Sequence, residues 1–201
     1  MAAEEGEDAG RRLGVVTAAA PAPRETVALE TERLRLRPRT PGDAEALFPS
    51  LSDPELMHFW SGPPHRDVAE TRADFSREAP DWRTWAITLK GSDSAIGFVA
   101  IGEKRQGGVS EIGYMLARAH WGGGIAIEAV SAVIDRVFAE GQRRIFADTD
   151  PENLASRGLL ERLGFQLEGV LRDEWETHIG VRDTALYGLL AGEWKGSTPR
   201  A

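Results

Sequence analysis

The chain has no cysteine among its 201 residues, which excludes disulfides and a cysteine nucleophile. No apolar run approaches the roughly 20 residues of a membrane span, and the N-terminus lacks the basic and then apolar order of a secretory signal. Basic side chains are in the minority, with 24 Lys and Arg against 32 Asp and Glu, so a nucleic-acid surface is not expected. We therefore predict a cytoplasmic protein without a membrane or nucleic-acid partner. Its net charge of −8 is compatible with a cationic substrate such as an amine.

Composition varies along the chain and defines three segments. Residues 1–26 are first acidic and then rich in small residues and proline, which predicts a flexible arm. Residues 27–195 carry the apolar periodicity of one folded domain with a sizeable core. Residues 196–201 include glycine, serine and proline, and we expect them to be frayed.

Two kinds of apolar periodicity alternate along the folded segment and predict an α/β fold. Period-two alternation and short apolar runs predict strands at 32–38, 85–90, 95–101, 110–116, 144–148, 165–170 and 185–190. Apolar residues that recur every three or four positions predict helices at 40–48, 66–75, 154–163 and from the glycines at 122–124 up to Gly141.

Three consecutive glycines, Gly122, Gly123 and Gly124, mark the junction between the strand at 110–116 and the long helix. The first turn of a helix leaves backbone N–H groups without partners, and the positive end of the helix dipole lies behind them. Glycine lets an anion approach this backbone closely because it has no Cβ. The junction therefore predicts a cradle for a diphosphate.

Spacing around the glycines narrows the choice of diphosphate. A P-loop needs Lys and then Ser or Thr after its last glycine, and neither is present. A dinucleotide fingerprint also fails, because counting from Gly122 places Ile127 in the last small-residue position. What remains is a glycine pattern that runs from Trp121 to Ala126. On these residues alone, a glycine-rich turn without a ligand stays open.

Asn153 and Ser156 form a second candidate pair at the start of the helix predicted at 154–163. Residues three apart share a helix face, so both side chains are expected to point into one crevice. That crevice lies beside the carboxyl end of the preceding strand, where open α/β sheets bind ligands. The alternative is local, with Asn153 as a helix N-cap and Ser156 as a first-turn surface residue.

Taken together, these motifs resemble the GCN5-related N-acetyltransferase superfamily, whose motif A is Arg/Gln-x-x-Gly-x-Gly/Ala. Gly124 and Ala126 fill its last two positions, whereas Trp121 stands where Arg or Gln is usual. Within the superfamily, the chain resembles the Rim-type branch, the ribosomal-protein N-acetyltransferases and their small-molecule relatives. The matching runs are Leu-Glu-Thr-Glu-Arg-Leu-Arg-Leu-Arg from residue 29, Glu-Ile-Gly-Tyr-Met-Leu at 111–116 and Asn-x-x-Ser before Leu-x-x-x-Gly-Phe, and the resemblance covers about 28–195.

The resemblance implies a mixed, strongly bent central sheet with splayed middle strands and helices on both faces. Acetyl-CoA would lie in the gap between the splayed strands, and no metal would be needed. Its pantetheine arm would pair with Met115, Leu116 and Asn153, and a Met115 or Leu116 N–H would polarise the thioester carbonyl. The pyrophosphate would lie on the loop of Trp121, Gly122, Gly123, Gly124, Ile125 and Ala126, held only by the backbone of 122–126.

The implied reaction is direct attack of an amine on the acetyl thioester, which needs two proton transfers. Ser156 is the candidate acid that protonates the departing thiolate. Glu111 is the candidate base, because it shares a strand face with Met115; a solvated strand-end carboxylate is an equal alternative. Glu103 and Asp148 are weaker candidates for the base.

An aromatic-walled acceptor pocket is expected from the segments 57–60 and 82–85 and from Trp175, although each tryptophan alone is more often a packing residue. The four histidines have no metal-like spacing. We predict an acceptor that is a protein N-terminus or a small-molecule amine, and a monomer or homodimer. A non-catalytic coenzyme A-binding regulatory module of the same fold and a different nucleotide-binding α/β protein are the rival hypotheses.

Overall fold

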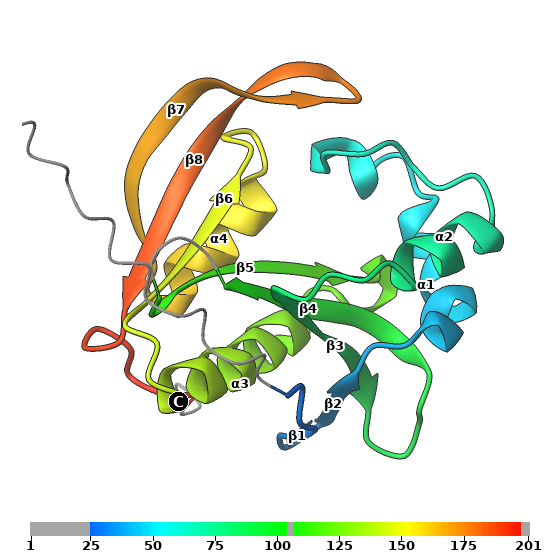
Figure 1. Cartoon of the computed structure of the whole chain (residues 1–201), viewed down its shortest axis with the longest axis horizontal. Coiled ribbons are helices and arrows are strands. Elements are labelled where there is room, and N and C mark those ends of the chain that lie inside the picture. The colour runs from blue at the N-terminus through cyan, green and yellow to red at the C-terminus, as the bar shows by residue number, and fades with distance from the viewer. Residues whose placement is uncertain (1–24, 104–106, 198–201) are drawn as a thin grey trace, which may run out of the picture.

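The computed structural model describes residues 25–103 and 107–197, and its described part is built on one mixed sheet (Figure 1). The sheet order is β1-β2-β3-β4-β5-β6-β8-β7. The strands are β1 Leu29–Glu30, β2 Leu34–Pro38, β3 Trp82–Leu89, β4 Ala95–Glu103, β5 Val109–Leu116, β6 Arg144–Thr149, β7 Gln166–Thr177 and β8 Gly180–Leu190. The helices are α1 Ala44–Leu51, α2 Val68–Phe75, α3 Ile125–Ala139 and α4 Leu154–Leu163, with 3-10 turns η1 Pro41–Asp43, η2 Met57–Phe59 and η3 Arg118–His120. The predicted arm at 1–26 and the frayed end at 196–201 lie largely outside the described residues.

One junction interrupts an otherwise antiparallel sheet. Strands β1 to β5 pair antiparallel in chain order, and so do β6 with β8 and β8 with β7. Strands β5 and β6 pair parallel through three residue pairs, the last of which joins Glu111 to Phe146. A parallel connection needs a crossover, and α3 provides it. Both strands continue past this last pair without pairing with each other again, so they splay apart.

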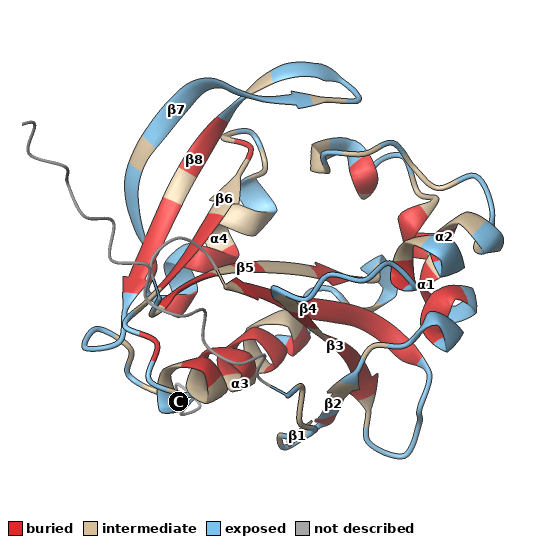
Figure 2. Ribbon diagram, viewed as in Figure 1, coloured by how far each residue is buried: buried red, intermediate tan, exposed pale blue. Residues whose placement is uncertain are grey.

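The two faces of the sheet carry separate cores, which Figure 2 shows as buried ribbon on both sides of β3 to β5. Alternation along β5 places Ile112 and Leu116 in the cluster with α3 and α4. Met115 points to the other face and packs with α1 and with Phe98 of β4. Helices therefore cover both faces, as predicted.

Helix α3 forms because apolar side chains recur on one stripe, with Ala129, Val133 and Val137 fully buried against the sheet. Burial of each such valine stabilises the fold by about 1.5–3 kcal/mol relative to exposure. Gly124 precedes the helix with φ +75°, and Gly141 follows it with φ +88°. Both glycines adopt backbone angles that other residues rarely take, so the helix starts and stops at defined points.

The structure departs most from the predicted elements in two regions of the chain. The helix expected at 40–48 is a 3-10 turn at Pro41–Asp43 followed by α1 from Ala44. The strands expected at 165–170 and 185–190 extend into a long hairpin, β7 with β8, whose outer half is exposed. This charged outer half has no apolar alternation, so it forms through pairing between β7 and β8 rather than through burial of one face.

Candidate active site

The free edge of β5 beyond Glu111 is the first part of the site. The Ala117 N–H donates to the Ile96 carbonyl at 2.8 Å, which fixes the phase of the ladder between β4 and β5. Since hydrogen-bonded and non-hydrogen-bonded pairs alternate, the Met115 backbone pairs with Phe98, whereas Leu116 directs its N–H and carbonyl away from β4. Tyr114 shares this direction. Of the two predicted pantetheine partners, the fold presents the Leu116 backbone to the gap, while Met115 contributes its side chain to the opposite core.

The glycine turn is the second part and lies directly after this edge. Gly122 has φ +79° and Gly124 has φ +75°, while no heavy atom lies within 4 Å of a Cβ built on Gly122 or Gly123. The first bond of α3 runs from Glu128 N–H to the Gly124 carbonyl. The N–H groups of Ile125 and Ala126 therefore have no partner inside the helix and face the turn with the positive end of the dipole. Backbone, open space and dipole together fit an anion.

Trp121, the departure from motif A, joins the two parts. Its indole N–H donates to the Leu116 carbonyl at 2.7 Å, and the Arg118 guanidinium lies 5.6 Å from its ring centroid. The side chain is 52% exposed, so it is no core residue. Because Trp121 occupies the Leu116 carbonyl, the N–H of Leu116 is the backbone group of that residue left facing the gap.

A charged brace that sequence reasoning missed holds the glycine turn. Arg33 donates to the Gly123 carbonyl at 2.8 Å and to Glu128 at 2.6 Å, and Thr31 donates to the same carboxylate at 2.6 Å. Burial raises the pKa of Glu128, but these hydrogen bonds outweigh it and hold the pKa below its usual value. The sequence signal for this brace was the run Thr-Glu-Arg at 31–33. Its hydrogen-bond partner Glu128 lies in α3, far away in the sequence, and only the fold brings the two together.

Asn153 is the N-cap of α4, which is the local alternative for this pair of residues. Its side chain accepts a hydrogen bond from the Ser156 N–H at 3.1 Å. The Ser156 hydroxyl, however, is partly buried and has a side-chain partner. It lies 2.9 Å from the hydroxyl of Tyr114, which crosses from β5. Burial raises the pKa of Tyr114 to about 12, although its hydrogen bond with Ser156 opposes the rise. Tyr114 therefore stays protonated at neutral pH, and the pair brings two hydroxyls to the splay.

The three candidate bases have different surroundings. Glu111 lies at the last β5–β6 pair and, by strand alternation, on the face of Met115, opposite to Tyr114. Glu103 accepts from Gln142 at 2.5 Å and so holds the strand ends together. Asp148 accepts from the indole of Trp175 at 2.9 Å. Glu111 and Asp148 therefore face the same side of the sheet, whereas Glu103 has a structural contact.

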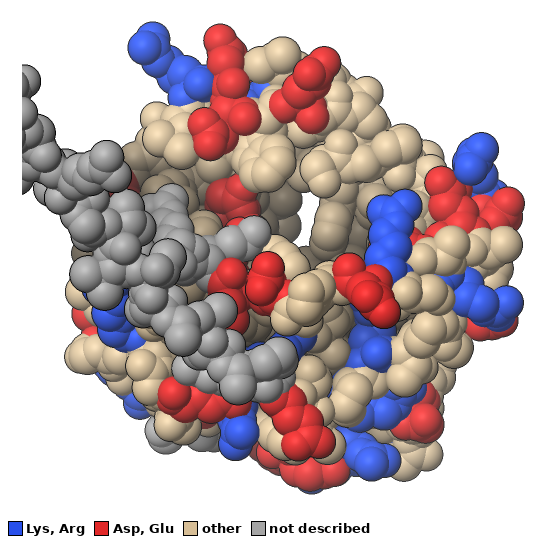
Figure 3. Space-filling model, viewed as in Figure 1, with Lys and Arg blue, Asp and Glu red and all other residues tan. Residues whose placement is uncertain are grey.

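The β7–β8 hairpin covers that side of the sheet. Figure 1 shows the hairpin arching over β5 toward the segment between α1 and α2. At its tip, His178 Nδ1 lies 3.1 Å from the Trp60 carbonyl, and the Trp60 ring packs edge-on against Phe98 at 5.8 Å. Figure 3 shows a hollow beneath this arch, with acidic side chains along part of its rim. Of the aromatic residues predicted for the acceptor pocket, Trp60 and Trp175 contribute to the wall of this hollow. Trp85 is instead fully buried in the core.

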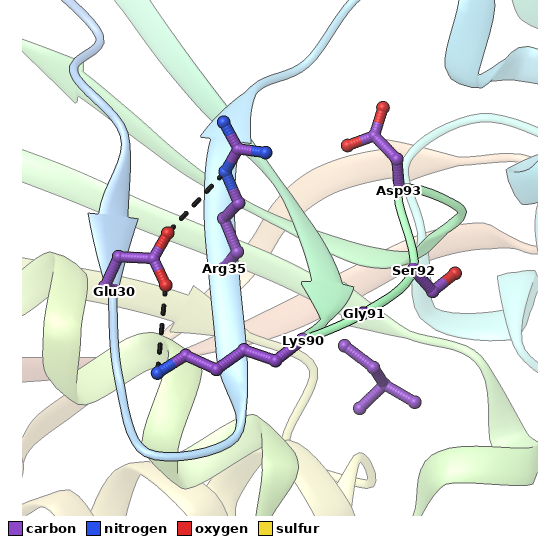
Figure 4. A pocket seen from close by; sticks show the side chains of 7 residues that line it. Glu30, Arg35, Lys90, Gly91, Ser92 and Asp93 are labelled. Carbon is purple, nitrogen blue, oxygen red and sulfur yellow. Dashed lines mark ion pairs between the residues drawn. The ribbon is translucent and has the colours of Figure 1, made fainter.

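A second surface hollow lies at the other edge of the sheet (Figure 4). Its lining comes from β1, β2 and the turn after β3, and Glu30 pairs there with Arg35 at 3.6 Å and Lys90 at 3.8 Å. Strand β2 is three strands from β5 in the sheet order, so this hollow takes no part in the site.

No group of three or more metal-ligating side chains occurs in the part of the chain that the structure describes. Within the same residues, no helix is both long and apolar enough to cross a membrane. The candidate site thus consists of a strand edge, a glycine turn, a pair of hydroxyls and carboxylates.

Comparison with known proteins identifies the family. Residues 33–166 match the model of the acetyltransferase (GNAT) domain, which is more than half of the chain. The chain therefore belongs to the GNAT acetyltransferase family, as the resemblance implied. It is 38% identical to a Bacillus licheniformis protein named uncharacterized N-acetyltransferase p20, over 84% of this chain and 98% of that protein.

Solved structures confirm the fold. A probable acetyltransferase of the GNAT family from Chromobacterium violaceum superposes with a TM-score of 0.80 at 27% identity, over 98% of each chain. A ribosomal L7/L12 alpha-N-protein acetyltransferase in complex with coenzyme A has a TM-score of 0.71 at 19% identity, over 81% of this chain and 97% of that chain. The predicted mixed sheet with splayed middle strands and flanking helices is therefore correct.

Proposed function

We propose that the protein is an acetyl-CoA-dependent N-acetyltransferase that moves an acetyl group to a primary amine. The observation that carries the proposal is the continuity between the free edge of β5 and the glycine turn, joined through Trp121 and Leu116. One extended ligand with an amide-bearing arm and a diphosphate matches both parts at once. The family membership supports the same reaction class.

Each part of the coenzyme has a counterpart in the chain. The backbone N–H groups of 122–126 would bind the pyrophosphate, since glycine at these positions leaves room and the α3 dipole favours a negative charge. The pantetheine amides would lie along the free edge of β5 at Tyr114, which leaves the Leu116 N–H for the thioester. The side-chain amide nitrogen of Asn153 makes no hydrogen bond within the described residues and remains available to the same arm.

The Leu116 N–H would stabilise the negative charge that develops on the thioester oxygen. The amine nitrogen attacks the carbonyl carbon, an N–C bond forms and the C–S bond breaks. A backbone donor preset in this way contributes on the order of 10²–10³ to the rate. Direct attack needs no covalent intermediate on the enzyme, and a thiol-based intermediate is excluded because the chain has no cysteine.

Two proton transfers accompany the attack. Ser156, held 2.9 Å from the Tyr114 hydroxyl, would donate a proton to the thiolate, and Tyr114 would orient it and replace the proton. On the other face of β5, Glu111 would accept the ammonium proton through a relay of waters, because it lies five residues, about 16 Å, before Leu116 along the strand. The two groups lie on opposite sides of one strand, so acid and base stay separate.

Calorimetry with acetyl-CoA, ATP and NAD tests the ligand, and we expect heat with acetyl-CoA alone. Thiol release with a panel of primary amines tests the reaction. Binding of acetyl-CoA without thiol release from any amine would instead support the non-catalytic regulatory module. No heat with acetyl-CoA would contradict both.

A further inference from the structure

Asp148 differs from the other carboxylates at the end of β6. Asp150 pairs with Arg182 at 2.7 Å, and Glu152 pairs with the same guanidinium at 2.5 Å. Asp148 accepts one hydrogen bond from the neutral indole of Trp175 and has no basic partner in the described parts of the chain. A half-buried carboxylate without a cation is a place where a positive ligand gains most.

The side chain of Asp148 lies on the face of the sheet that the β7–β8 hairpin covers. Strand alternation puts it on the same face as Phe146, and Phe146 is paired with Glu111. Two residues further along each diverging strand, Asp148 lies across the gap from Gly113. No heavy atom lies within 4 Å of a Cβ built on Gly113, so the strand opposite the carboxylate leaves room.

Aromatic side chains and the hairpin enclose this space. Trp175 lies on β7 beside Asp148. Across the space from Trp175, Trp60 packs against Phe98 on the same face of the sheet. The contact between His178 and the Trp60 carbonyl closes the arch above this space. A covered space of this kind admits a slender chain more readily than the surface of a folded protein.

We propose that the acceptor is a slender aliphatic amine with a second positive charge, and that Asp148 binds this second ammonium beside Trp175. The inference rests on the proposed function, since the other amine is the one acetylated. A carboxylate that contacts an ammonium stabilises its charged form and opposes the proton loss that attack requires. Asp148 therefore binds the distal group. At about 3.3 Å per residue, Leu116 lies roughly 10 Å along β5 from Gly113, a span that an alkyl diamine can bridge.

Matched amines test the proposal through acetyl-CoA thiol release. Diaminoalkanes of four to six carbons are compared with 1-aminoalkanes of equal length, which lack the second charge. We expect kcat/KM to favour the diamines by about tenfold or more, and Asp148→Asn to abolish most of that preference. Glu176→Gln removes a charge from the neighbouring, outward-facing position of β7 and should leave the preference intact. Trp175→Phe keeps a ring but removes the donor to Asp148, and should change the preference if Asp148→Asn fails to fold.

Calorimetry with the coenzyme A-loaded protein separates this inference from the proposed function. A diamine preference in binding that Asp148→Asn removes supports the subsite, even if no amine releases thiol and the catalytic proposal fails. Equal use of diamine and monoamine by the unmodified protein would overturn the inference while acetyl transfer stands. So would a preference that persists in both Asp148→Asn and Trp175→Phe.

Discussion

The two sides of the splayed sheet are built from different materials. The side that we assign to the coenzyme, the coenzyme side, offers backbone groups of Leu116 and of residues 122–126, and Arg33 and Glu128 brace it from behind. The side that we assign to the acceptor, the acceptor side, offers side chains on the segment around η2 and on an exposed hairpin, where Trp175 of β7 is 45% exposed. Backbone donors persist through most substitutions, whereas side chains change with each one. We therefore propose that one side defines the reaction class and that the other defines the acceptor.

The largest expected effect lies where the two sides meet, at the hydroxyl pair. Ser156→Ala should lower kcat about 100-fold with every amine, because the thiolate then leaves without its proton donor. Tyr114→Phe should lower kcat less, since Ser156 keeps its own hydroxyl. Steady-state thiol release measures both. Unchanged thiol release in Ser156→Ala would contradict the acid assignment.

Gly123→Val sharpens the coenzyme side. Its side chain would occupy the space that we assign to the pyrophosphate, so KM for acetyl-CoA should rise about tenfold or more. Gly123 does not have a positive φ, so the melting temperature should stay nearly unchanged. Acetyl-pantetheine, which lacks the diphosphate, is the matched control and should be used equally by both proteins. An equal loss with both thioesters would argue against a diphosphate at this turn.

The brace behind the turn should have a smaller effect. Arg33→Lys keeps the charge but loses the fork that reaches both Gly123 and Glu128, and KM for acetyl-CoA should rise about threefold to tenfold. Acceptor KM should remain constant because the brace lies on the other side of the sheet. Arg35→Lys, at an exposed arginine of β2 two positions further along the chain, is the control.

On the acceptor side, His178→Ala removes the contact that closes the arch. Acceptor KM should rise by only about threefold, because a single exposed hydrogen bond is lost. KM for acetyl-CoA should not change. Ile179→Ala, an exposed neighbour at the same tip, is the control. A change in KM for acetyl-CoA in His178→Ala would break the separation of the two sides.

The smallest effect concerns stability at high pH. Burial raises the pKa of Tyr114 to about 12, above its ordinary value of about 10. The protonated form is therefore favoured by folding, and its contribution is complete below pH 10 and lost as the pH rises to 12. Denaturant unfolding at pH 8 and pH 11 should show a fall that is weaker in Tyr114→Phe. An equal fall in both proteins would place the sensitive group elsewhere.

Much of the coenzyme side was visible in the sequence because its signals are local. Glycines that must take positive φ, the cap at Asn153 and the stripe on α3 need only neighbours along the chain. The contact of Tyr114 with Ser156 joins residues 42 positions apart, and that of Asp148 with Trp175 joins residues 27 apart. No short-range pattern encodes such pairs. The role of Trp121 also needed the fold, since its acceptor is a backbone carbonyl.

The sequence by itself determined the glycine turn, the order of strands and helices and the family, because backbone conformation and apolar periodicity are properties of consecutive residues. Only the tertiary structure decided which side of β5 stays unpaired, since that depends on where β6 diverges after Glu111 and Phe146. Within the residues that the structure describes, it also left Asp148 without a cation, whereas Arg182 pairs with Asp150 and Glu152. Charge pairing across the hairpin is a matter of distance in space, and sequence separation does not reveal it.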